Sequence, residues 1–216
     1  MSFSDRQVNG QPTVSHYFSK EEPDRTNPRT FYYTFGKNTY TFTTDAGVFS
    51  VGKMDAATDI LLRHIPVLQG SLLDMGCGYG CIGIVLAKEY GLKLTQADIN
   101  PRALRLTEEN AVRNSVASHI VQSDGFNQIE GLFDTIVINP PIHAGKNVIF
   151  TMYEKAYKHL RPSTVSSDGG SLYIVILKKH GAESSIKFLT KVFGNCHIIY
   201  KKKGCYVLEA KLIGYK

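Results

Sequence analysis

The stretch that most constrains the fold is residues 71 to 90. A short apolar run ends at Asp74 and is followed by three glycines at alternate positions, Gly76, Gly78 and Gly80. The segment after Gly80 is mostly apolar and has the composition of a helix. Glycine allows a tight turn with positive φ and lets a ligand come close to the backbone, and the amides that begin the helix would face that ligand. We therefore predict a strand, a glycine turn and a helix at a binding site.

The glycine turn alone leaves its ligand open. Gly78, Gly80 and Gly83 also satisfy the G-x-G-x-x-G pattern of dinucleotide-binding proteins, which would indicate a nicotinamide-dependent oxidoreductase. A tight connection without any ligand is a further alternative. Asp74, two residues before the first glycine, favours instead a ligand with a positively charged ammonium group.

From residue 71 onward, segments with strand and helix character alternate. The strands are expected at 71–75, 92–98, 118–122, 133–138 and 170–177, and the helices at 81–90, 101–114, 147–160 and 182–193. A closing hairpin, 196–200 and 204–210, should add one antiparallel strand around a basic turn. Such alternation predicts an α/β fold with a doubly wound, mostly parallel seven-stranded sheet of Rossmann-like type.

The part before residue 67 reads as a small β-rich extension. Aromatic and β-branched arms at 31–35 and 39–43, joined by a three-residue turn, predict a hairpin, and 55–64 has helical spacing. Upstream, only Val14–Phe18 could form a strand. We therefore divide the chain into 1–66, the extension, and 67–216, the main domain, which can form one compact unit.

Composition bounds the function classes. The 216 residues suffice for one α/β domain with a small addition. No apolar run approaches the roughly 20 residues that span a bilayer, and the polar start is no secretion signal. The four cysteines, Cys77, Cys81, Cys196 and Cys205, have neither zinc nor disulfide spacing. We expect a cytoplasmic protein without a metal or a membrane partner, and the net charge of +6 suits a polyanionic partner.

Polar residues follow several of the predicted strands, where ligands of open parallel sheets bind. After the second strand, Asp98 could accept both hydroxyls of a ribose and Ile99 could lie on an adenine ring. After the third, Asp124 and Gly125 could read the exocyclic amine of adenine. The alternatives are that Asp98 caps the next helix and that Asp124 and Gly125 form an ordinary turn.

The most informative strand end is Asn139-Pro140-Pro141-Ile142. Two prolines stop a sheet ladder because neither has an N–H, and Pro141 restrains Pro140. Two acceptors then stand side by side, the side-chain oxygen of Asn139 and the carbonyl of Pro140. Together they could hold the two N–H bonds of a planar amine and aim its lone pair at an electrophile. A plain Pro-Pro loop is the alternative.

These motifs resemble a known family. The D-x-G-x-G-x-G at 74–80, Asp98 and the N-P-P-I at 139–142 are similar to motifs of class I S-adenosylmethionine-dependent methyltransferases that modify planar amino nitrogens. The G-V-F-S at 47–50 resembles the lead-in of the methyltransferase small domain family, which includes the ribosomal small-subunit RNA guanine-N2 methyltransferases. The resemblance covers about residues 30–212, and the A-G-K after N-P-P-I is similar to short single-domain bacterial members.

The resemblance implies a cofactor, a reaction and a set of site residues. It implies an N-methyltransferase that uses S-adenosylmethionine and forms N2-methylguanosine in small-subunit ribosomal RNA. No general base is needed, because the amine loses its proton after the carbon–nitrogen bond forms. Asn139, Pro140, Pro141 and Ile142 would hold the target amine. The cofactor-binding residues would be Asp74, Gly76, Cys77, Gly78, Gly80, Asp98, Ile99, Asp124, Gly125 and Asn139.

Two other functions remain open beside this one. Protein glutamine N5-methyltransferases look similar around Asn-Pro-Pro, but they usually carry a following Tyr and a helical amino-terminal domain. A non-catalytic RNA-binding module is the other alternative. Ile142 stands where many amino-methyltransferases have an aromatic ring, so stacking on a base would come from elsewhere, with Phe49 as one candidate.

Basic residues gather on loops at the predicted carboxyl ends of the strands. An RNA partner would meet them there, since phosphate contacts supply affinity and position the target. Simple solvation of these lysines is the alternative. The predicted RNA-binding residues are Lys146, Lys178, Lys179, Lys201, Lys202 and Lys203.

Overall fold

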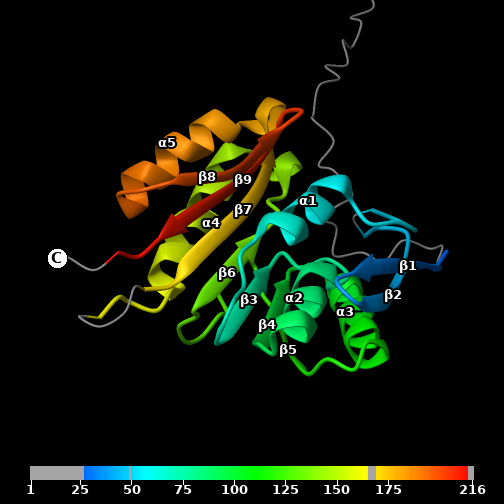
Figure 1. Ribbon diagram of the computed structural model, residues 1–216. Helices are drawn as coiled ribbons and strands as arrows, with labels where there is room; N and C mark the ends of the chain where they lie inside the picture. The colour runs from blue at the N-terminus through cyan, green and yellow to red at the C-terminus, as the bar shows by residue number, and fades with distance from the viewer. Residues whose placement is uncertain (1–26, 49, 165–168, 214–216) are drawn as a thin grey trace, which may run out of the picture.

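A seven-stranded sheet forms the centre of the molecule (Figure 1). The computed structural model describes residues 27–48, 50–164 and 169–213, so Phe49 and the candidate strand Val14–Phe18 lie outside the described residues. The strand order is β5-β4-β3-β6-β7-β9-β8. The strands are β3 (Ser71–Met75), β4 (Lys93–Asp98), β5 (Ser118–Gln122), β6 (Thr135–Ile138), β7 (Ser171–Leu177), β8 (His197–Lys202) and β9 (Cys205–Lys211).

The sheet is parallel from β5 to β7, and β9 is antiparallel to both of its neighbours, β7 and β8. The prediction of a mostly parallel sheet with one antiparallel strand is confirmed. All four residues of β6 are buried, as expected for a central parallel strand that is covered on both faces. The carboxyl ends of β3 and β6, which pair directly, therefore lie side by side at one edge.

Helices cover both faces of the sheet and divide the core in two. Helices α1 (Ala56–His64), α2 (Cys81–Tyr90) and α3 (Pro101–Arg113) bury their apolar residues in one cluster, and α4 (Lys146–His159) and α5 (Ala182–Phe193) in the other. Alternate residues of β3 belong to opposite clusters: Leu72 faces the first and Leu73 the second. Two single-turn helices, η2 (Ile142–Ala144) and η3 (Lys178–His180), follow β6 and β7.

A separate hairpin, β1 (Arg29–Phe35) and β2 (Asn38–Thr44), packs on α3. Its turn has two residues rather than the expected three, because Phe35 pairs with Asn38 and leaves only Gly36 and Lys37 between the strands. Gly36 takes a positive φ of 57°, and a two-residue turn with glycine first suits the twist of a hairpin.

Asn110 of α3 and Asn114, which caps the end of that helix, complete the outer edge of β2. The side chain of Asn110 accepts from the N–H of Thr43 at 2.8 Å and donates to its carbonyl at 2.9 Å. Asn114 does the same for Thr41, at 3.0 and 2.9 Å. The helix thus satisfies backbone groups that a third strand would otherwise pair.

The closing hairpin corrects one part of the prediction. Lys201 and Lys202 belong to β8, and the turn consists only of Lys203 and Gly204. Both turn residues have positive φ, 48° and 77°, as a type I′ turn requires. The compact turn extends the pairing by two residues.

Candidate active site

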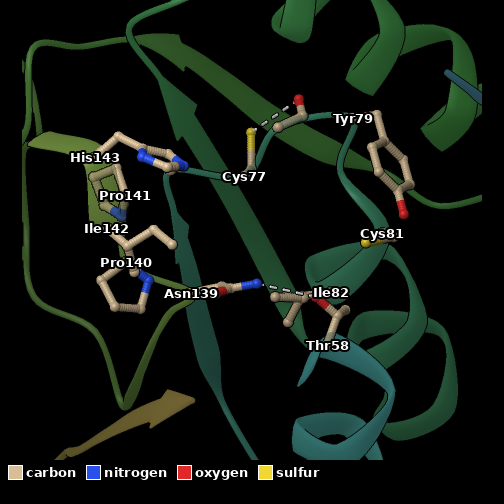
Figure 2. A pocket seen from close by; sticks show the side chains of 12 residues that line it. Thr58, Cys77, Tyr79, Cys81, Ile82, Asn139, Pro140, Pro141, Ile142 and His143 are labelled. Atoms are coloured by element: carbon tan, nitrogen blue, oxygen red, sulfur yellow. Dashed lines mark hydrogen bonds between the residues drawn. The ribbon is translucent and has the colours of Figure 1, made fainter. Parts of the chain in front are cut away.

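A cavity of about 180 Å³ opens where β3 and β6 end (Figure 2). One side, the glycine wall, consists of residues between Gly76 and Ile82 in the turn that leads into α2. The other side, the proline wall, consists of Asn139 to His143 after β6. Thr58, from the first turn of α1, completes the lining. The structure therefore brings together the two motifs that the sequence singled out.

The glycines of the turn fall into two groups. Gly76 and Gly78 have φ of 72° and 59°, and a Cβ on either would meet no atom within 4 Å. A Cβ on Gly80 or Gly83 would instead come within 3.1 Å or less of the side chain of Gln96 on β4. The first two glycines keep the glycine wall open toward the cavity, and the last two let α2 pack closely on the sheet.

Asp74 lies beneath the glycine wall and is only 1% exposed. Its Oδ2 accepts from the N–H of Gly83 at 2.8 Å and from Nε2 of Gln96 at 3.2 Å. Burial raises the pKa of Asp74 to about 7; these hydrogen bonds oppose the rise, and the charge of Asp98 adds to it. Asp74 is not one of the described residues that line the cavity, so its interaction with the ammonium group of a cofactor remains a prediction.

Asp98 ends β4 with its carboxylate against the glycine wall. It accepts from the N–H of Gly78 and from the N–H of Asn100, both at 2.9 Å, and burial raises its pKa. The side chain of Asn100 caps α3 by accepting from the N–H of Arg102 at 2.9 Å. The alternative that Asp98 is the helix cap is therefore wrong. Asp98 is not among the described residues that line the cavity, so its contact with the ribose of a cofactor remains a prediction.

The predicted adenine contacts lie farther from the cavity. Asp124 is exposed, and its N–H binds Oε1 of Gln128 at 3.0 Å within a turn in which Gly125 has a φ of 55°. Ile99 is half-buried beyond the end of β4. None of Asp124, Gly125 and Ile99 is among the described residues that line the cavity, so their contacts with a cofactor remain predictions.

On the proline wall, the side chain of Asn139 is held by α1. Its Nδ2 donates to Oγ1 of Thr58 at 3.1 Å (Figure 2). Pro141 precedes the single turn η2, and its carbonyl accepts from the N–H of Ala144 in that turn at 2.9 Å. Sequence reasoning missed Thr58 because no spacing links residue 58 to residue 139. Its only signal is its place three residues after Asp55, which caps α1.

Two buried cysteines also line the cavity. Burial raises the pKa of Cys81 to about 12 and places that of Cys77 well above its ordinary value, so both remain neutral thiols near pH 7. Cys77 was predicted to contact the cofactor, whereas Cys81, Tyr79, Ile82 and His143 were not. Neutral thiols add apolar surface, which suits an uncharged part of a ligand.

Basic side chains collect at the same edge of the sheet. The N–H of Lys178 donates to the carbonyl of Gly204 at 2.7 Å, which places η3 beside the β8–β9 turn. The pKa of His180 is lowered mainly by burial, and the charges of Lys179 and His143 lower it further. Since His143 belongs to the proline wall, η3 also lies near that wall. Lys146 begins α4, with its Nζ 5.1 Å from the ring centre of Phe150.

Neither a metal site nor a membrane-spanning helix occurs in the described ranges. Residues 27–48, 50–164 and 169–213 contain no group of three His, Cys, Asp or Glu side chains placed to hold a metal ion. In the same ranges, the helices are too short or too polar to cross a bilayer.

The sheet, with its antiparallel β9, and the cavity between the glycine and proline walls define a class I methyltransferase that uses S-adenosylmethionine. The model of the methyltransferase small domain family matches residues 39–209. The chain belongs to this family. The open positions at Gly76 and Gly78 fit a cofactor held against the backbone.

Relatives and a solved structure support the same assignment. The chain is 38% identical over 204 residues to the uncharacterized protein YbxB of Bacillus subtilis, covering 92% of this chain and 98% of YbxB. It is 40% identical over 142 residues to ribosomal RNA small subunit methyltransferase C of Aeromonas hydrophila, 62% of this chain and 42% of that enzyme.

The structure of the T. thermophilus 16S rRNA N2 methyltransferase RsmC, in complex with AdoMet (S-adenosylmethionine) and guanosine, superimposes with a TM-score of 0.74 at 26% identity. The match covers 88% of this chain and 52% of the RsmC chain. This chain thus spans about half the length of the named RNA methyltransferases that it matches.

Proposed function

We propose that this methyltransferase forms N2-methylguanosine in small-subunit ribosomal RNA. The observation that carries the proposal is the placement of Asn139 and Pro140 on the proline wall, opposite the glycine wall of one cavity. A methyl donor on one wall and an amine on the other would lie within reach of each other. Proximity and alignment of this kind lower a barrier by roughly 7–11 kcal/mol.

The target amine has to match two acceptors. The exocyclic N2 of guanine is planar and carries two N–H donors, which suit the side-chain oxygen of Asn139 and the carbonyl of Pro140. S-adenosylmethionine supplies an electrophilic methyl group when bound. The residues of the chain orient the amine, and Ile142, 36% exposed on the proline wall, offers an aliphatic surface to the face of the base.

The polymer to which the base belongs is argued from the rim of the cavity and from the relatives. Lys178, Lys179 and Lys203 lie on η3 and the adjoining turn, at the edge that holds the cavity. Phosphates bound there would position the RNA, and the base would have to leave its stack at a cost of a few kcal/mol. The Aeromonas and T. thermophilus relatives bear names that specify small-subunit RNA.

The test is transfer of a labelled methyl group from S-adenosylmethionine to purified small ribosomal subunits, to free ribosomal RNA and to release factors. The products are digested to nucleosides and amino acids and separated. We expect label in N2-methylguanosine from the subunit or its RNA. Label in glutamine of a release factor would replace the proposal with protein methylation, and label in another nucleoside would change the target base.

A further inference from the structure

Thr58 contacts the proline wall from a distant part of the sequence. It is 2% exposed, and its N–H donates to Oδ2 of Asp55, the cap of α1, at 2.9 Å. Its hydroxyl oxygen accepts from Nδ2 of Asn139 at 3.1 Å (Figure 2). The contact joins residues 81 positions apart, so α1 sets the position of a side chain that follows β6.

The direction of this hydrogen bond decides what Asn139 presents to a ligand. A side-chain amide has a donor end and an acceptor end. Because Nδ2 of Asn139 is hydrogen-bonded to Thr58, the acceptor Oδ1 remains available to a ligand, and none of the described residues donates to it. Turned by 180°, the amide would present N–H groups to an amine that is itself a donor. Only the observed orientation can hold the N–H of a target amine.

Helix α1 is a firm support for this contact. Its Leu61 and Leu62 are buried, and Asp59 accepts from the hydroxyl of Tyr33 on β1 at 2.8 Å. The hydroxyl of Thr58 is therefore fixed by a helix that is packed on one side and tied to the hairpin on the other. A hydrogen bond that is partly shielded from solvent, as this one is, restricts the rotamers of both partners more than one in open water does.

We propose that Thr58 is a positioning residue for methyl transfer, which holds the amide of Asn139 with its oxygen toward the target amine. The inference rests on the proposed transfer to an amino nitrogen and adds to it a residue from the segment before the glycine wall. Thr58 itself need not touch the substrate. Its effect should therefore fall on turnover and not on cofactor binding.

The orientation is tested first without any substrate. In the full-length chain labelled with ¹⁵N, the side-chain amide signal of Asn139 is assigned by its absence in Asn139→Ala. We expect Thr58→Val to shift this signal and to speed its exchange with water at least about tenfold, since an unbonded amide is open to solvent. Thr58→Ser keeps the hydroxyl and should resemble the wild type. An Asn139 signal that is identical in Thr58→Val would overturn the inference.

Turnover provides the second test, on the substrate that the wild type methylates. Thr58→Val should lower kcat about 10- to 100-fold, because misplacement of an orienting group costs that much, while KM for S-adenosylmethionine stays the same. Thr58→Ser should restore most of the rate. Thr190→Val on α5, which loses a hydroxyl that donates to the carbonyl of Ile186, is the matched control. Equal losses in Thr58→Ser and Thr58→Val would overturn the inference.

The two proposals fail separately. A wild-type chain that leaves guanine N2 unmodified overturns the proposed RNA product, whereas the amide signal of Asn139 still reports whether Thr58 holds it. Conversely, if Thr58→Val forms N2-methylguanosine at the wild-type rate, the proposed function stands and Thr58 is not a positioning residue.

Discussion

The glycine wall and the proline wall face each other across one cavity, and the chain shapes them in different ways. The glycine wall relies on residues without side chains: Gly76 and Gly78 adopt positive φ and leave space for a ligand. The proline wall relies on restraint, because Pro140 and Pro141 limit the backbone and Asn139 is held by α1. The first wall offers room and backbone amides, and the second offers fixed acceptors. We infer that binding and orientation are separable.

The largest expected effect is on the proline wall. Asn139→Ala should lower the rate of methyl transfer about 100- to 1,000-fold, as removal of an aligned polar group does in other active sites. The affinity for S-adenosylmethionine, measured by calorimetry, should change much less than the rate, because Asn139 is one of several predicted cofactor contacts and the glycine wall is intact. Asn147→Ala, an exposed position on α4, is the control. Equal losses of rate and affinity would show that the two walls are not separable.

The reciprocal change is on the glycine wall. Gly78→Ala should weaken cofactor binding about tenfold or more, because the methyl group enters the cavity, while backbone strain costs about 1–2 kcal/mol of stability. Gly83→Ala is the matched variant, and its Cβ would meet Gln96 and Leu94 at 2.8 Å. It should destabilise the fold by about 1–3 kcal/mol through overpacking. Denaturant unfolding and calorimetry on both variants measure the contrast, and a reversed order would contradict it.

The basic rim beside the proline wall should affect RNA and not the cofactor. Replacing Lys201, Lys202 and Lys203 with Glu should weaken RNA binding and lower its salt dependence by about 0.7–0.9 for each phosphate that these lysines neutralise. The same charge change on exposed residues of α4 and α5 serves as the control: Lys158, Lys187 and Lys191 to Glu. Binding measured over a series of salt concentrations gives the slope. An equal fall in the control would place the RNA elsewhere.

The smallest expected effect is a pH dependence of stability and of cofactor binding, which arises from Asp74 beneath the glycine wall. Burial raises the pKa of Asp74 to about 7, so its contribution to stability falls as pH rises from its ordinary pKa toward 7. A cationic ligand favours the ionised carboxylate, so binding should release a proton and tighten by about three- to tenfold from pH 6 to pH 8. Calorimetry in two buffers measures the proton, and Asp74→Asn should abolish this part of the dependence. An unchanged dependence in Asp74→Asn would assign it to another group, such as Asp98.

Much of the sheet could be predicted from local patterns. The apolar runs of β6 and β7 are long enough to indicate buried parallel strands, and the glycines at 76, 78 and 80 mark the turn where the first strand of the sheet meets its helix. Both motifs placed on the cavity carry special backbone chemistry, either freedom at glycine or restraint at proline. Motifs built from glycine or proline can therefore be recognised in the sequence without knowledge of the fold.

The errors and omissions have a common physical cause. The turn at Gly36 and the extent of β8 depend on which residues pair across strands, and a register is set by tertiary contacts as well as by local sequence. Thr58 gives no local sign of its contact with Asn139. The buried position of Asp74 likewise depends on its hydrogen bond with Gln96 on the neighbouring strand, and no pattern in residues 71–83 predicts that contact.

The asparagine side chains that bind β2 have a consequence for behaviour at high concentration. An open strand edge recruits strands from other molecules, and this is a common route to aggregation. Asn110 and Asn114 occupy the backbone groups of Thr43 and Thr41 that such a strand would need. The two side-chain amides therefore block the pairing of β2 with a strand from another molecule, although β2 lies at an edge of its hairpin.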